Sequence, residues 1–201
     1  TSEAEALAAE VLHRDPLNFW ARNELYAAAR VREHAPALAS DLEELTQLMR
    51  GDVQAYLELA CDYMHVGMWD DAIDVLRRPI TTKMEPADTY PLLHYYLGYA
   101  LEQRGDKVAA AECYRQAATM PTDYCFPFRL ESRDVLQSAL AVNSRDARAE
   151  YYLGNLLFDL QPEVAMQHWE DSRRLDPSLA VVHRNAGWAA NHVNNDVPGA
   201  I

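Results

Sequence analysis

The sequence predicts an all-α, right-handed solenoid built from about five antiparallel helix pairs, some of them partial. Three observations predict it. Three segments align around a small residue in a first helix, a tight polar turn follows each of them, and a second small residue lies in a second helix. Hydrophobic residues make up 49% of the 201 residues, which is typical of a globular chain rather than a disordered one.

Two of the segments align around Leu97-Gly98 and Leu153-Gly154, and the third has Ala60 in the equivalent place. The turns that follow lie at residues 67–70, 105–107 and 160–163. The second helices carry a small residue and, four positions later, a larger one, in the pairs Ala72 and Leu76, Ala110 and Tyr114, and Ala165 and Trp169. The small residues allow two helices to approach closely. We expect the larger residues to fill the seam towards the next pair.

The flanking segments fit the same pattern less completely. Residues 1–14 predict the second helix of a pair whose first helix precedes the sequence. Residues 17–33 and 36–49 predict a degenerate pair. Residues 179–194 predict the first helix of a further pair, and residues 197–201 predict the start of its second helix. The chain is therefore expected to form one helical-repeat domain over 1–201, cut from a longer protein.

Two irregular connectors interrupt this register, near 79–88 and near 120–129. The second contains Pro121 and Pro127, which cannot both lie within a helix interior. A helical pattern resumes at Leu130 and continues to Val142. One pair is thus predicted to have lost most of its first helix and to carry an aromatic extended segment instead.

This arrangement resembles the tetratricopeptide repeat (TPR), a helix pair of about 34 residues. The amino-acid sequence of particular stretches resembles the C-terminal TPR tail of large bacterial proteins that carry an uncharacterised β-rich domain of unknown function. The stretches are Asp15–Arg22, Asp123–Pro127, Arg129–Glu131, Ala149–Asn155, Leu175–Pro177 and His183–Asn185. The resemblance implies an excerpt of a multidomain protein. Gln161-Pro162 departs from the repeat, because this turn is one residue short.

The charge limits the partners. The 18 basic and 31 acidic side chains give a net charge of −13, which argues against nucleic acid and against anionic lipid as main partners. No apolar run approaches the roughly 18 residues of a membrane span, and no signal peptide is visible, so we expect a cytoplasmic protein. The segment 41–74 holds nine acids and one base, Arg50, whereas several arginines fall on the predicted inner face after residue 145.

No motif predicts an enzyme, a metal or a cofactor. Cys61, Cys113 and Cys125 form no CxxC motif and are expected to be buried thiols. The seven histidines lack zinc-binding spacing, and phosphate-binding loops and GxSxG elbows are absent. The carboxylate pairs Glu43-Glu44 and Asp70-Asp71 are expected near helix starts, where they favour the helix dipole.

The remaining candidate site is the concave groove, which first helices line in stacked repeats. Spacing assigns seven residues to it: Tyr95, Tyr99, Arg148, Tyr152, Asn155, Arg184 and Trp188. Arginine and asparagine suit peptide carboxylates or acidic side chains, and the aromatic rings would bury apolar side chains. Alternatively, these rings simply pack between helices.

These observations predict a non-catalytic scaffold that binds a protein or peptide through the groove. A structural alternative is that the repeats pack against an upstream domain, or self-associate through the truncated repeat ends, where an apolar helix face is exposed. In a third reading, an enzymatic activity, for instance on carbohydrate, belongs to the upstream domain, as the family resemblance implies.

Overall fold

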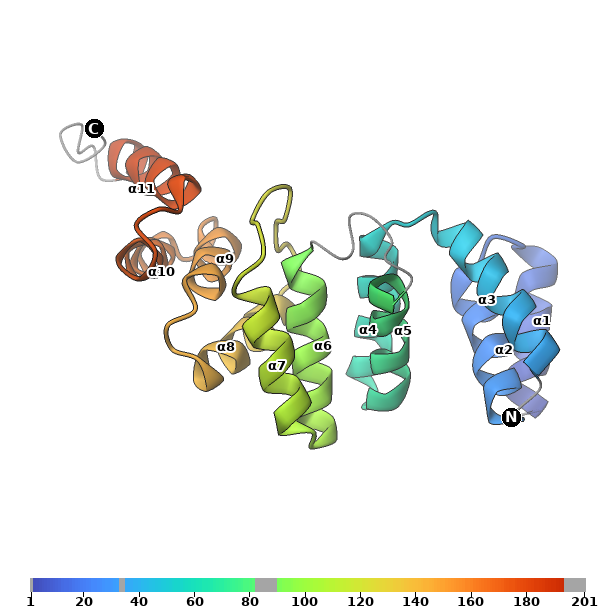
Figure 1. Ribbon diagram of the computed structural model, residues 1–201. Coiled ribbons are helices and arrows are strands. Elements are labelled where there is room, and N and C mark those ends of the chain that lie inside the picture. Colours follow the sequence, from blue (N-terminus) through green and yellow to red (C-terminus); the bar gives the residue numbers. More distant parts are fainter. Residues whose placement is uncertain (1, 33–34, 82–89, 194–201) are drawn as a thin grey trace. The chain divides into compact units, whose positions relative to one another are not determined.

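In the computed structural model we describe residues 2–32, 35–81 and 90–193, and within these ranges the chain forms helices, turns and loops but no strand. The helices in chain order are α1 (Ser2–Arg14), α2 (Phe19–Val31), α3 (Ala35–Met49), α4 (Val53–His65), α5 (Trp69–Thr81), α6 (Pro91–Arg104), α7 (Lys107–Ala117), α8 (Glu131–Val142), α9 (Ala147–Leu157), α10 (Pro162–Leu175) and α11 (Ala180–Val193) (Figure 1). The predicted all-α fold of helix pairs is confirmed.

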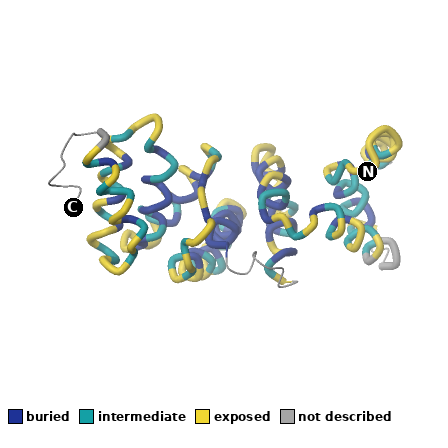
Figure 2. Tube along the Cα trace, turned by 90° about the horizontal axis from the view of Figure 1, so that it is seen from above, coloured by how far each residue is buried: buried dark blue, intermediate teal, exposed yellow. Residues whose placement is uncertain are grey.

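The chain divides into two compact units, Thr1–Asp88 and Thr89–Ile201. The first contains the pairs α2–α3 and α4–α5, and the second contains α6–α7 and α9–α10. Buried positions gather along the sides of the helices that face a neighbour, while exposed positions face outward (Figure 2). Whether the two units form a single domain, as the repeat pattern predicts, stays a prediction.

In the second unit, Gly98 and Gly154 each lie under an aromatic ring. A Cβ atom on Gly98 would lie 2.6 Å from Cε1 of Tyr114, and one on Gly154 would lie 2.3 Å from Cδ1 of Trp169. The Tyr114 hydroxyl donates to Glu102 of α6 at 2.9 Å. Both rings therefore cover the first helix of their own pair, whereas we had expected them to fill the seam towards the next pair.

The first connector is shorter than predicted. Helix α5 continues through Pro79 to Thr81, so residues 79–81 are helical, and residues 82–88 lie outside the described residues. Pro79 has no N–H to donate to the carbonyl of Val75, so the helix loses one hydrogen bond there, and α5 ends two residues later at Thr81. The second connector, predicted near 120–129, falls within residues 118–130, which contain no helix. The helix predicted from residue 197 lies outside the described residues.

Two smaller expectations are also corrected. Glu43-Glu44 lies in the second half of α3 rather than near its start, and Glu44 pairs with Arg22 of α2. Of the three cysteines, Cys61 and Cys125 are buried, but Cys113 is partly accessible on α7. The helical spacing predicts that Cys113 lies within a helix. It does not indicate whether neighbouring segments bury the thiol, and they cover it only in part.

A buried polar network joins α2 to α4 and α5. Asn23 is 1% exposed. Its Nδ2 donates to the Tyr63 hydroxyl at 2.7 Å, and its Oδ1 accepts from Nη1 of Arg78 at 2.7 Å. The Arg78 guanidinium also pairs with Asp74 and lies 4.4 Å from the centre of the Tyr26 ring. Each polar group needs its partner here, because an unsatisfied buried group costs more than a hydrogen bond returns.

We predict that Asn23→Leu lowers the free energy of unfolding by about 2–4 kcal/mol, because the buried Arg78 and Tyr63 lose a shared partner. Urea denaturation measures the change. Asn191→Ala, at an exposed position of α11, serves as the control and should change stability by less than about 0.5 kcal/mol. A loss below about 1 kcal/mol for Asn23→Leu would mean that the network does not stabilise this unit.

We predict that Gly154→Ala destabilises the chain by about 1–3 kcal/mol, because the added methyl group would overlap the Trp169 ring. In a Trp169→Leu background, which imitates the Ala60 and Leu76 pair of α4 and α5, the same change should be neutral or stabilising by up to about 1 kcal/mol, since alanine favours helix. A four-variant urea denaturation cycle measures the coupling. An equal loss in both backgrounds would show that the ring is not the cause.

Candidate functional site

A groove of about 320 Å³ lies in the second unit between α9, α10 and α11, with one wall supplied by the 118–130 connector. Its volume falls at the lower end of the range of ligand sites. The residues that line it are Phe126, Tyr151, Asn155, Phe158, Asp159, Trp169, Arg184, Asn185 and Trp188. They combine aromatic rings with amides and two charged groups.

The aromatic part is a set of three rings from three successive elements. Phe158 stacks on Trp169 with ring centres 5.0 Å apart, and it meets Trp188 edge-on at 5.5 Å. Trp188 is 51% exposed, so much of its ring is accessible. An accessible tryptophan held by a second ring offers a large apolar surface at little cost in conformational entropy.

The polar part is a chain of hydrogen bonds that ends on Arg184. Oδ1 of Asn155 accepts from Nε1 of Trp169 at 3.1 Å and from Nδ2 of Asn185 at 2.9 Å. Oδ1 of Asn185 in turn accepts from Nε and Nη2 of Arg184 at 3.3 and 3.2 Å. Burial raises the pKa of Tyr151, while a hydrogen bond with Asn155 and the charge of Arg184 oppose that rise.

Arg184 is an exposed cation whose only hydrogen-bond partner among the described residues is the neutral amide of Asn185. Most other arginines of the described segments, such as Arg173 and Arg174, pair with a neighbouring carboxylate. The guanidinium of Arg184 therefore keeps donors available at the side of the groove. Such a group recognises a carboxylate with charge-assisted hydrogen bonds.

The structure brings together three of the seven sequence-predicted groove residues, namely Asn155, Arg184 and Trp188. Tyr95 and Tyr152 lie fully buried in the core, with ring centres 6.2 Å apart. Tyr99 is partly buried on α6, where burial and then the nearby Asp134 and Glu102 raise its pKa. None of these three tyrosines lines the groove.

Arg148 also lies outside the groove lining, because its guanidinium is used within the chain. Its Nε donates to the backbone oxygen of Met120 at 2.6 Å, and its Nη1 lies 3.6 Å from Oδ2 of Asp176. Arg148 therefore fixes the start of the 118–130 connector. Helical spacing predicts that Arg148 lies on α9. It does not predict the hydrogen bond to the carbonyl of Met120, because Met120 belongs to an irregular connector.

Sequence reasoning did not assign Phe126, Trp169 or Asn185 to the site. Phe126 belongs to an irregular connector, so no helical period indicates which way its ring points. The repeat pattern predicts a packing role for Trp169, and Trp169 also has that role, because it covers Gly154. A signal existed for Asn185, since it directly follows Arg184 and lies about one turn before Trp188 on the same helix.

The buried carboxylate of Asp146 has a structural role. Asp146 is 1% exposed and caps α9, with Oδ1 accepting from the backbone N–H groups of Arg148 at 3.1 Å and Ala149 at 3.0 Å. Its Oδ2 accepts from the Tyr95 hydroxyl at 2.8 Å. Burial raises the pKa of Asp146, and the hydrogen bonds oppose that rise. This cap ties the start of the groove helix α9 to α6.

Within the described ranges, no group of three or more metal-ligating side chains comes together. None of the helices in these ranges has both the length and the apolar composition of a bilayer-crossing segment.

No model of a known protein family matches the chain, and no curated protein matches it. The chain is similar to a crystal structure of MamA protein, at 18% identity over 100% of this chain and 87% of that one, with a TM-score of 0.36. It is also similar to YrrB, described as a TPR protein with an unusual peptide-binding site, at 19% identity over 96% and 87% of the two chains, with a TM-score of 0.35. At these values the likeness supports no transfer of site or function, and the fold assignment rests on the helices of this chain.

We predict that Asp146 makes the folded chain less stable as pH rises. Because its folded-state pKa lies above the ordinary value of 3.8, the folded chain holds this proton more tightly than the unfolded one. The contribution of Asp146 to the unfolding free energy therefore falls as pH rises from 3.8 through the folded-state pKa, and is constant above it. Urea denaturation of the wild type and of Asp146→Asn across this interval measures the difference.

Tyr95→Phe provides a second variant for the same measurement. It removes one of the hydrogen bonds that oppose the rise in the pKa of Asp146, so the loss of stability with pH should extend to higher pH. A wild-type minus Asp146→Asn difference that stays constant with pH would contradict this account of the buried carboxylate.

Proposed function

We propose that the chain is a non-catalytic scaffold that binds a short protein segment in the groove between α9, α10 and α11. The observation that carries this proposal is the juxtaposition of an accessible aromatic surface, Trp188 with Phe158, and an available guanidinium, Arg184, in one open groove. Tryptophan and arginine are among the residues that most often anchor interfaces, and both are present here.

In the proposed binding mode, an apolar side chain of the partner packs on Trp188 and Phe158 while a carboxylate accepts hydrogen bonds from Arg184. Asn185 holds the guanidinium, and Asn155 holds Asn185. These bonds exist without a partner, so little side-chain freedom remains to be lost on binding. Preorganisation of this kind favours affinity in a small groove.

We assign three of the four sequence-predicted residues outside the groove lining to support of the groove. Arg148 holds the connector that carries Phe126, and Tyr95 holds the Asp146 cap of α9. Tyr152 fills the core beside Tyr151, a lining residue, with ring centres 5.2 Å apart. Tyr99 remains a proposed contact on the accessible surface of α6. The assignment of the chain to the C-terminal tail of a larger cytoplasmic bacterial protein stays a prediction.

A specific observation favours self-association as a second candidate function. The 118–130 connector exposes the rings of Tyr124, Phe126 and Phe128, with Tyr124 91% exposed. Clustered exposed rings often mark a contact surface. Light scattering of the wild type and of a Tyr124→Ser plus Phe128→Ser variant tests this candidate. A concentration-dependent dimer that becomes monomeric in the variant supports it, and a monomeric wild type contradicts it.

We predict that Trp188→Ala and Arg184→Ala each weaken peptide binding by about tenfold or more, because each removes an anchor of the groove. Binding is measured on an array of octapeptides with varied sequence, followed by fluorescence anisotropy on the strongest binders. Both positions are exposed, so the variants should retain the wild-type circular dichroism spectrum.

Arg145→Ala is the matched control, because it removes an exposed arginine that does not line the groove. It should retain binding. If Trp188→Ala and Arg184→Ala bind the selected peptides as tightly as the wild type, the groove is not the binding site.

A further inference from the structure

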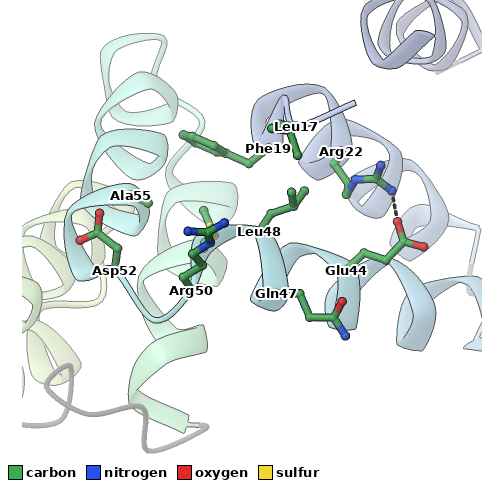
Figure 3. A pocket seen from close by; sticks show the side chains of 10 residues that line it. Leu17, Phe19, Arg22, Glu44, Gln47, Leu48, Arg50, Asp52 and Ala55 are labelled. Carbon is green, nitrogen blue, oxygen red and sulfur yellow. Dashed lines mark hydrogen bonds and ion pairs between the residues drawn. The ribbon is translucent and has the colours of Figure 1, made fainter. Parts of the chain in front are cut away.

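A second cavity lies in the other unit and is independent of the proposed function. It has a volume of about 620 Å³ and lies between the start of α2, the end of α3 and the start of α4 (Figure 3). The residues that line it are Leu17, Phe19, Arg22, Glu44, Gln47, Leu48, Met49, Arg50, Asp52 and Ala55. This volume is within the range of sites for small ligands and short peptides.

One part of the cavity is apolar. Leu17 lies in the turn before α2 and Phe19 is the first residue of α2, and Leu48 from the last turn of α3 lies close to them (Figure 3). Leu17 is 72% exposed although it faces this space. An apolar side chain that is accessible inside a cavity gains free energy when a ligand covers it.

Two guanidinium groups lie on opposite sides of this apolar part (Figure 3). Arg22 donates from Nη1 to Oε2 of Glu44, and its Nε is buried with no hydrogen-bond partner among the described residues. Arg50 is exposed, and none of the ion pairs found in the described ranges involves it. One cation is thus largely neutralised and the other is available.

The two carboxylates of the cavity are already used. Glu44 pairs with Arg22, and Oδ1 of Asp52 accepts from the backbone N–H of Gln54 at 3.0 Å as the cap of α4. Asp52 keeps its negative charge while it caps α4, and Arg50 is the cation of the cavity that remains available to a ligand. A carboxylate complements it, because a guanidinium binds the two oxygens of a carboxylate side by side.

The backbone at Arg50 is a second, independent observation. Its φ is 51°, in the left-handed region, and Gly51 follows with a φ of 69°. Residues with a Cβ atom are strained in this region, and glycine is the residue that fits it. Helices commonly end with a residue in this region, and Arg50 directly follows Met49, the last residue of α3. Here the strained position carries the available guanidinium into the cavity.

We propose that this cavity binds a ligand with an apolar body that ends in a carboxylate. The apolar body packs on Leu17, Phe19 and Leu48, and the carboxylate pairs with Arg50. A free aliphatic acid and the C-terminal residue of a peptide share this chemistry, and the test separates these two sources.

Isothermal titration calorimetry of the full chain tests the proposal with two probes, octanoate and an acetylated Ala-Ala-Leu peptide with a free carboxylate. Saturable binding of at least one is expected, and whichever binds identifies the source. The controls are octanol and the same peptide as its C-terminal amide, which should bind at least tenfold more weakly. No saturable binding of either carboxylate, or equal binding of the neutral controls, would overturn the proposal.

Arg50→Gly provides the decisive variant, because glycine suits the left-handed backbone and should leave the melting temperature unchanged or higher. Probe affinity should fall at least tenfold. Arg77→Ala, which removes an exposed arginine of α5 outside the cavity, should retain it. Wild-type affinity in Arg50→Gly would overturn the proposal. Arg184→Ala, in the other unit, should also leave probe binding intact. The cavity is therefore tested by Arg50→Gly and the proposed groove by Arg184→Ala, so a negative result for one proposal does not count against the other.

Discussion

The close contact between a glycine in a first helix and an aromatic ring in a second helix sets the geometry of the second unit. A Cβ atom at Gly98 or Gly154 would overlap Tyr114 or Trp169, so each helix pair reaches its spacing only because that atom is absent. The ring then has a polar end near the first helix, where Glu102 or Asn155 accepts its hydrogen. A single packing choice therefore fixes both the distance between the helices and the orientation of the ring.

The candidate groove depends on this contact. Trp169 covers Gly154 with one part of its ring, stacks on Phe158 with its face and donates to Asn155 with its nitrogen. Asn155 then orients Asn185, which holds Arg184. The core of the α9–α10 pair and the surface of the groove are thus one connected set of side chains. A change at Gly154 should therefore alter the groove as well as stability.

Polar interactions do a similar task in the first unit, where buried Asn23 and Arg78 join α2 to α4 and α5. Most arginines in the described segments pair with a carboxylate, as expected for an acidic chain. Arg50 and Arg184 are exceptions, and each lies in a cavity beside apolar side chains. The net charge of −13 therefore describes the chain as a whole but not these two sites.

The sequence alone determined the all-α helix pairs, because small residues and helical spacing report directly on helix faces. It also predicted an irregular connector near 120–129 and placed Asn155, Arg184 and Trp188 on one face, and a binding role for these three residues stays a prediction. Only the tertiary structure decided that Tyr95 and Tyr152 are core residues, that Arg148 holds Met120, and that Phe126 and Trp169 reach the groove. The reason is physical. Sequence periodicity determines which face of a helix a residue occupies. The segments that cover this face are distant in sequence, so periodicity does not predict them. An irregular connector has no periodicity, so the direction of its side chains is not predicted at all.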